Sequence, residues 1–217
     1  LLALWASSNV NSTFKKYSRQ LSSRGITGAE AARRVLSANG VTGVRIESVP
    51  GNLTDHYDPR ANVIRLSQSV FSSSSTAAIG VACHEAGHAV QYAQNYGPIK
   101  LRAAIIPITN IGSKLAMPLI MLGVVLTFLG SMSYLFIYLG IIAFSLSLVF
   151  QLVTLPVEFN ASRRAREILV SEDILSGREV VGVTKVLNAA AMTYVAALAT
   201  SLASLLRLIL IFNNRRR

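Results

Sequence analysis

The chain has 217 residues, of which 52% are hydrophobic and only 14% are charged, whereas soluble domains usually carry about 25% charged residues. No charged side chain occurs between Leu115 and Leu155, and a run of about 18 apolar residues already suggests a membrane span. The formal net charge of +11 would suit nucleic acid or an anionic membrane surface, but only a membrane explains both features. No nucleic-acid-binding motif occurs, so we expect no nucleic-acid partner.

The N-terminal residues are apolar and then become basic. We expect residues 1–10 to be the end of an N-terminal membrane anchor. Residues 11–24 place Phe14, Tyr17 and Leu21 among basic residues. That spacing suits a helix at the inner lipid surface and equally a solvated helix.

Residues 11–102 are predicted to form a small cytoplasmic domain of mixed helix and strand. Thr27 and Glu30 have the spacing of a capping box, alternation predicts one strand, and an Asp-Pro-Arg-Ala-Asn turn predicts a hairpin. A serine run then offers an N-cap to the longest helix of the domain. The predicted elements are a helix over 27–39, a strand over 44–49, a hairpin over 55–66 and a helix over 76–95.

Residues 103–155 are predicted to form a transmembrane hairpin that turns near 130–133. The first half contains Pro107 and Pro118, so we expect a kinked helix there. Residues 156–188 are predicted to be a cytoplasmic helical part, and residues 189–212 a further membrane helix.

Basic residues are distributed unevenly along the chain. Eleven lie between Lys15 and Arg102, five lie between Arg163 and Lys185, and the turn near 130–133 has none. Because basic residues collect on the cytoplasmic side, we expect a multi-pass protein of the cell (inner or plasma) membrane whose polar segments face the cytoplasm. Arg215 to Arg217 complicate this topology, since they would lie outside if 189–212 spans.

The central motif is His84-Glu85-Ala86-Gly87-His88. Residues i and i+4 lie on one face of a helix, so the two imidazoles can bind one cation, for which zinc is the expected ion. Glu85 lies beside that face and can take a proton from the attacking water. A surface helix with two chance histidines is the alternative, but the chain has only three histidines and the helix is made of small and apolar residues.

Catalytic zinc usually takes three protein ligands, and the candidates for the third are His56 and Glu158. Glu158 follows the predicted hairpin. An even number of membrane crossings between residues 88 and 158 returns it to the side of the motif, so it is the better candidate. A helix N-terminal acid that interacts with the helix dipole is its structural alternative.

Four stretches of the sequence resemble the YugP-type membrane zinc metallopeptidases, relatives of the HtpX-type gluzincins. They are residues 55–60 (DHYDPR), 84–88 (HEAGH), 155–165 (LPVEFNASRRA) and 185–191 (KVLNAAA). The resemblance implies a gluzincin site with Glu158 as third ligand and proteolysis of membrane or misfolded proteins. Where related gluzincins often have an acid that orients a histidine ligand, this chain has Ser162, a weaker acceptor.

Substrate contact is expected along an edge strand. In zincins such a strand beside the metal pairs with the extended substrate, and Val63, Ile64 and Arg65 are the available candidates. An ordinary core hairpin is the alternative for these residues.

The sequence therefore predicts a mainly α, multi-pass membrane protein with a small cytoplasmic α+β zincin-like metallopeptidase domain. Its expected partners are membrane lipids, protein or peptide substrates, and either a second copy or a regulatory membrane protein. The competing hypothesis is a non-catalytic membrane scaffold that retains a structural metal.

Overall fold

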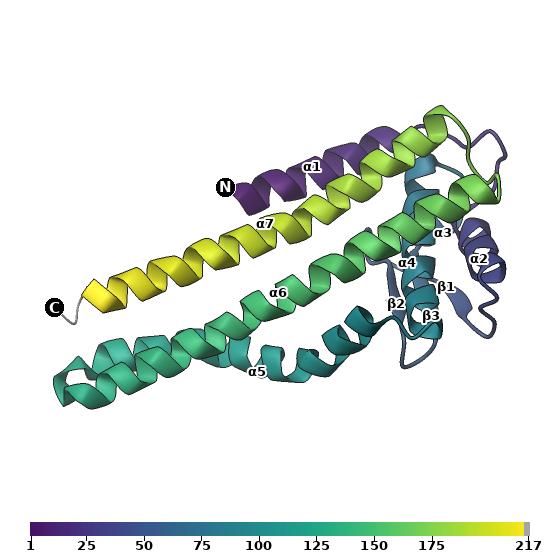
Figure 1. The fold of residues 1–217 in the computed structure, drawn as a ribbon. Helices are drawn as coiled ribbons and strands as arrows, with labels where there is room; N and C mark the ends of the chain where they lie inside the picture. Colours follow the sequence, from purple (N-terminus) through teal and green to yellow (C-terminus); the bar gives the residue numbers. More distant parts are fainter. Residues whose placement is uncertain (215–217) are drawn as a thin grey trace.

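The computed structural model describes residues 1–214 as long helices and one small sheet (Figure 1). The helices are α1 (Leu2–Tyr17), α2 (Gly28–Ala38), α3 (Gln68–Phe71), α4 (Thr76–Ala93), α5 (Gly97–Val125), α6 (Ser131–Ser171) and α7 (Arg178–Asn214), with a 3-10 helix η1 (Leu126–Leu129) after α5. The strands are β1 (Arg45–Val49), β2 (His56–Asp58) and β3 (Val63–Ser67). The mainly helical class is confirmed. The arginines at 215–217, on which part of the topology prediction rests, lie outside the described residues.

The hydrophobic core lies around α4, at one end of the molecule (Figure 1). It joins α4 to α2, to β3, to the last turns of α6 and to the first turns of α7. Helix α2 begins with the predicted capping box, in which Thr27 accepts from the Glu30 amide and the Glu30 carboxylate accepts from the Thr27 amide. Helix α4 begins after Ser75, whose hydroxyl accepts from the Ala78 amide.

The sheet has the strand order β1-β3-β2, so β3 is its central strand. Strand β1 pairs parallel with β3, and β2 pairs antiparallel with β3 as the predicted hairpin. Strand β2 is therefore an edge strand, and it is the strand whose free edge faces α4.

Within residues 1–214, three helices are long and apolar enough to cross a membrane, over Gly97–Phe128, Met132–Ser171 and Arg178–Asn213. Helices α5 and α6 form an antiparallel hairpin that extends away from the sheet (Figure 1). The reversal is at Gly130, where φ is +61°, close to the predicted turn.

Helices α6 and α7 run through the boundaries expected at 155/156 and at 188/189. Pro156 lies inside α6 without ending it. A proline removes one backbone hydrogen bond, whereas ending the helix beside lipid would expose several unpaired groups. The predicted membrane and polar segments are thus parts of the same two helices.

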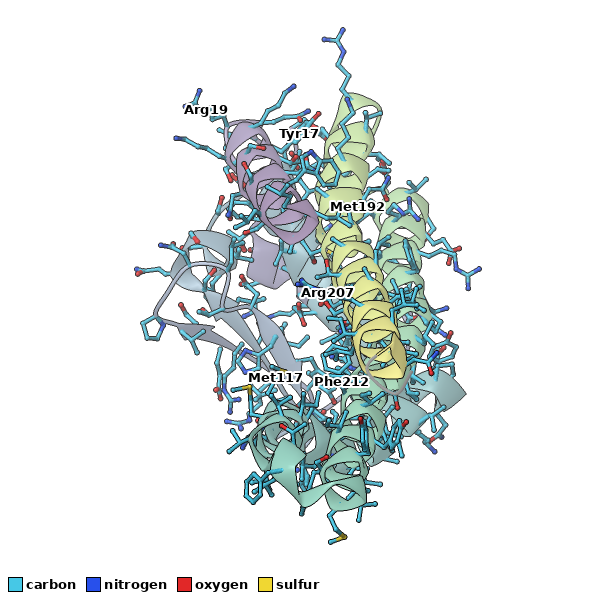
Figure 2. The ribbon with its side chains drawn as sticks, turned by 90° about the vertical axis from the view of Figure 1, so that its left-hand side faces the viewer. Tyr17, Arg19, Met117, Met192, Arg207 and Phe212 are labelled. Atoms are coloured by element: carbon cyan, nitrogen blue, oxygen red, sulfur yellow. The ribbon has the colours of Figure 1, made fainter. Side chains whose placement is uncertain are left out.

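Helix α1 is one continuous helix that packs along α7 (Figures 1 and 2). The sequence suggested a membrane anchor ending near residue 10 and a separate helix over 11–24. The observed helix joins both segments and ends at Tyr17.

Glycine allows α5 and α6 to approach closely. A Cβ atom at Gly140 would lie 2.6 Å from Ile120 Cγ1 and 2.8 Å from the Ala116 carbonyl oxygen. Small residues at such contacts are the usual means by which apolar helices associate.

We predict that Gly140→Val forces α5 and α6 apart and lowers the thermal unfolding temperature in detergent. Leu139→Val is the matched control, because Leu139 is exposed on the same helix. Equal unfolding temperatures for the two variants would contradict the close packing.

Candidate metal centre

Helix α4 places two imidazoles one turn apart, with His88 buried and His84 partly buried. The rings of His84 and His88 have centroids 4.7 Å apart and meet edge to face. The helix can sit deep because its residues are small, and a Cβ atom at Gly87 would lie only 2.8 Å from the Ala161 carbonyl oxygen of α6. Gly87 therefore sets how closely α4 and α6 approach.

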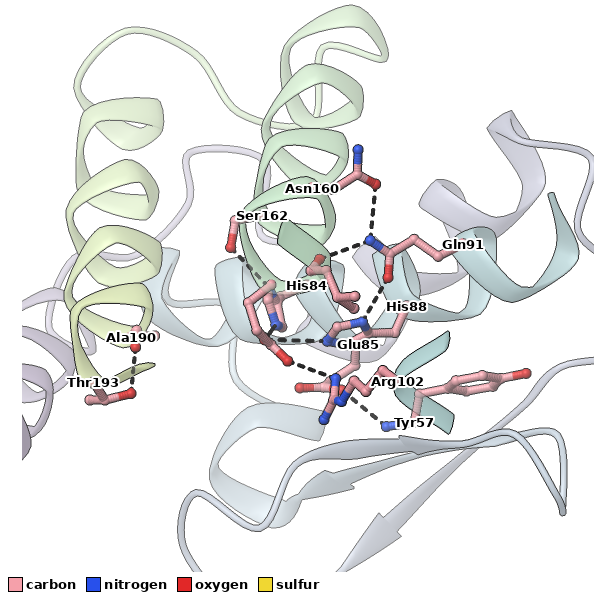
Figure 3. Close-up of polar contacts among 12 residues, drawn as sticks. Tyr57, His84, Glu85, His88, Gln91, Arg102, Asn160, Ser162, Ala190 and Thr193 are labelled. Carbon is pink, nitrogen blue, oxygen red and sulfur yellow. Dashed lines mark hydrogen bonds and ion pairs between the residues drawn. The ribbon is translucent and has the colours of Figure 1, made fainter. Parts of the chain in front are cut away.

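Helix α6 brings the Glu158 carboxylate to both imidazoles. Its Oε2 atom lies 3.2 Å from His84 Nε2 and 3.5 Å from His88 Nε2, and the side chain is only 2% exposed. The three ligand atoms all lie within 4.8 Å of one another. The structure thus brings together the three residues that the sequence proposed as metal ligands, and Figure 3 shows the two histidines side by side.

The hydrogen bonds around the histidines direct both Nε2 atoms toward one point. Gln91 uses its amide nitrogen to donate to the Val157 carbonyl and to Asn160 Oδ1, so its Oε1 is left to accept from His88 Nδ1 at 3.0 Å. That contact fixes the proton on Nδ1 and leaves a lone pair on Nε2.

His84 has the corresponding partner in Ser162, whose Oγ lies 3.0 Å from His84 Nδ1. The predicted contact between Ser162 and a ligand histidine is therefore present. Two imidazoles and one carboxylate, with the imidazoles oriented from behind, match the ligand set of a catalytic zinc site. The residues present fit zinc.

The charge of Glu158 is balanced by a residue that the sequence did not indicate. Arg102 on α5 donates to Glu158 Oε1 at 2.9 Å. A buried carboxylate would otherwise carry a large desolvation cost. Burial lowers the pKa of His88, but the carboxylates of Glu158 and Glu85 outweigh it, so the pKa of His88 is raised. Because zinc binds neutral imidazole, acid should weaken metal binding.

Glu85 faces the edge strand of the sheet. Its Oε2 accepts from the Tyr57 amide of β2 at 3.0 Å (Figure 3). It is adjacent to the ligand cluster but not a member of it. One backbone amide thus holds this half-buried carboxylate beside the ligand cluster.

Two cavities meet at this cluster. One of about 290 Å³ lies between β2 and α5 and is lined by polar groups including Tyr57, Tyr92 and Arg102. The other, of about 150 Å³, lies between α1, α4 and α7 and is mainly apolar, with Phe14 and Ala190 in its wall. Glu85, His84 and Glu158 line both cavities. Asp55 and Tyr194, for which the sequence predicted no role, also line both.

The substrate-strand prediction was wrong. Val63, Ile64 and Arg65 lie in β3, which is hydrogen-bonded on both sides, so it has no free edge, and the first two are fully buried. The edge strand beside the metal centre is β2. A β-branched and apolar run indicates a buried strand, and the burial of β3 reflects its central position in the sheet rather than contact with substrate.

His56, the other candidate for third ligand, does not join the cluster. Its Nδ1 lies 2.8 Å from the Thr54 carbonyl oxygen, and its Nε2 lies 3.5 Å from Arg65. It lines the polar cavity instead.

Gln91 and Arg102 were missed because neither belongs to a motif. Gln91 lies three residues after His88 and is fully buried. The one signal that the sequence offers is a polar residue on the same face of the helix as the motif. Arg102 belongs to the group of basic residues that the sequence analysis explained by the cytoplasmic bias of positive charge, so it did not stand out as a site residue.

Comparison with known proteins gives a family whose description also names zinc. The family model described as "Putative neutral zinc metallopeptidase" matches residues 1–213. "Putative membrane protease YugP" of Bacillus subtilis (strain 168) is 53% identical over 215 residues, which cover 99% of this chain and 93% of that protein. No solved structure gives a significant match.

We predict that Gln91→Leu lowers zinc affinity by about 10- to 100-fold, the usual effect of removing a group that orients a metal ligand. Competition with a chromogenic chelator measures this. Gln94→Leu is the control, since Gln94 is exposed on the same helix end. Unchanged affinity in the Gln91 variant would show that the amide does not orient His88.

Proposed function

We propose that this chain, which belongs to the family described as "Putative neutral zinc metallopeptidase", is an integral-membrane endopeptidase that hydrolyses peptide bonds of membrane or misfolded proteins. The observation that carries the proposal is the position of Glu85 beside the His84, His88 and Glu158 cluster. A scaffold with a structural metal would need the ligands but would have no use for a further carboxylate.

Zinc, when bound, polarises the scissile carbonyl and makes water easier to deprotonate. Glu85 accepts the proton of the attacking water, held in place by the Tyr57 amide, and later donates it to the leaving amine. Arg102 donates to Glu158 and fixes the position of its carboxylate. Tyr194 lies beside Glu158 and lines both cavities, where its hydroxyl can donate to the oxygen that gains negative charge.

The two cavities provide a seat for an extended peptide on either side of the metal centre. The free edge of strand β2 lies beside the metal centre. The Tyr57 amide there already donates to Glu85, so the peptide can pair by strand addition through the Tyr57 carbonyl group. The apolar cavity would receive one apolar side chain next to the scissile bond.

The membrane arrangement follows from helix length. Glu158 is 27 residues after Ser131 (158 − 131), the first residue of α6, which is about 40 Å along a helix and exceeds the roughly 30 Å of a bilayer core. The metal centre would therefore lie at a membrane surface. The concentration of basic residues in the same end favours the cytoplasmic surface.

We expect Glu85→Gln to lower peptide cleavage by about 100- to 10,000-fold, because the amide cannot carry a proton between water and amine. Zinc content, measured by elemental analysis, should stay at the native level since Glu85 is not a ligand.

Glu167→Gln provides the control for that experiment, because Glu167 is an exposed acid on α6 and should keep native activity. Native turnover in Glu85→Gln with full zinc content would refute the catalytic role and favour the scaffold hypothesis.

The apolar cavity makes a prediction about specificity. Ala190→Phe would fill much of the roughly 150 Å³ space, so kcat/KM should fall by about tenfold or more for peptides with Leu or Phe at the cleavage site. Peptides with Ala there should be affected less. Ala199→Phe, at an exposed position on the same helix, should leave unchanged the ratio of kcat/KM for Leu or Phe peptides to kcat/KM for Ala peptides. The same ratio in both variants would exclude this cavity as the specificity site.

A further inference from the structure

Besides the two cavities at the metal centre, a groove opens between α1 and α7. It has a volume of about 330 Å³. The contact between α1 and α7 separates it from the apolar cavity, since Val10 and Phe14 of α1 line the cavity and other residues of α1 line the groove. The groove is lined by Asn9, Thr13, Lys16, Tyr17, Lys185, Asn188, Ala189 and Met192.

The lining of this groove is rich in hydrogen-bond donors and positive charge. Lys16 and Lys185 contribute one ammonium group from each helix, two asparagine amides and two hydroxyls lie between them, and no acid is in the lining. Neither lysine takes part in the ion pairs found among residues 1–214; Lys16 lies 5.7 Å from the centre of the Tyr17 ring. Such a set of groups is complementary to a phosphate.

The groove also lies at the depth of lipid headgroups. Lys185 and Asn188 directly precede the apolar stretch 189–212 of α7, and Thr13 and Lys16 follow the apolar start of α1. Figure 2 shows Tyr17 and Arg19 at one end of this helix pair, Met192 further along, and Phe212 at the opposite end. The lysines therefore lie where both helices leave the apolar layer, with Ala189 and Met192 on the apolar side of the groove.

We propose that this groove binds the phosphate headgroup of an anionic phospholipid, with the acyl chains lying along the apolar surfaces of α1 and α7. Basic pockets between membrane helices on the cytoplasmic side have the charge and position that such headgroups require. A free phosphate would satisfy the lysines but would leave the apolar surface below them without a partner. A phospholipid is therefore the occupant that matches both the lysines and the apolar surface.

A bound lipid would hold α1 against α7. Helix α1 supplies Val10 and Phe14 to the apolar cavity of the metal centre, so its attachment keeps that wall in place. Occupation of the groove should therefore reduce local opening of α1, which amide hydrogen exchange detects without any measurement of peptidase activity.

The test uses the full chain in nanodiscs of phosphatidylcholine with or without phosphatidylglycerol, followed by native mass spectrometry of retained lipid. The native protein should retain phosphatidylglycerol in preference to phosphatidylcholine. Lys16→Gln/Lys185→Gln should bind it about 25-fold more weakly, since each lysine near an anionic lipid contributes about fivefold. The amides of α1 should exchange more slowly in the anionic discs only for the native protein.

Lys15→Gln/Lys100→Gln is the matched control, because it removes the same two charges from exposed positions outside the groove. This variant should keep selective lipid binding. Equal losses in both variants would show diffuse attraction to the surface and overturn the site, as would undiminished binding in the groove variant. Displacement of the lipid by millimolar inorganic phosphate would also contradict it, by showing that the anion alone is recognised.

Discussion

The structure depends on one contact, the approach of a buried carboxylate to two imidazoles from another helix. Glu158 is held within 3.2 Å and 3.5 Å of the two Nε2 atoms, although it is almost completely buried. Burying an ionised carboxylate is favourable only when charge and hydrogen bonds surround it. Arg102 supplies the charge, and a cation between the three ligands would supply the rest. The requirement for such partners explains why residues from α4, α5 and α6 converge here.

The long helices serve to bring those partners together. Helix α5 leaves the sheet end, η1 and Gly130 reverse the chain, and α6 returns to deliver Glu158 beside α4. Gly87 lets the returning helix come close enough for the carboxylate to reach both imidazoles. Helix α7 then adds Tyr194, and α1 covers one side of the cavity. The apolar hairpin thus has a positional role in the site as well as membrane affinity.

Local rules predicted the parts of the site that share one helix or one motif. The spacing of His84 and His88, the capping of α2 and α4, and the return of Glu158 after the apolar hairpin follow from helical geometry and hydropathy. The central position of β3 in the sheet could not be predicted in this way, because strand order depends on pairing between distant segments. Gln91 and Arg102 also required the structure, since a polar side chain gains its role from a neighbour 66 or 56 residues away.

X-ray absorption at the zinc edge, applied to the native protein and to Glu158→Ala and His56→Ala, tests the central contact most directly. We predict two imidazole ligands and carboxylate oxygen in the native protein, at the usual distances of about 2.0–2.2 Å. The Glu158 variant should lose most of its zinc, and the His56 variant should give the native spectrum. A third imidazole in the native spectrum, or full zinc retention without Glu158, would contradict the proposed ligand set.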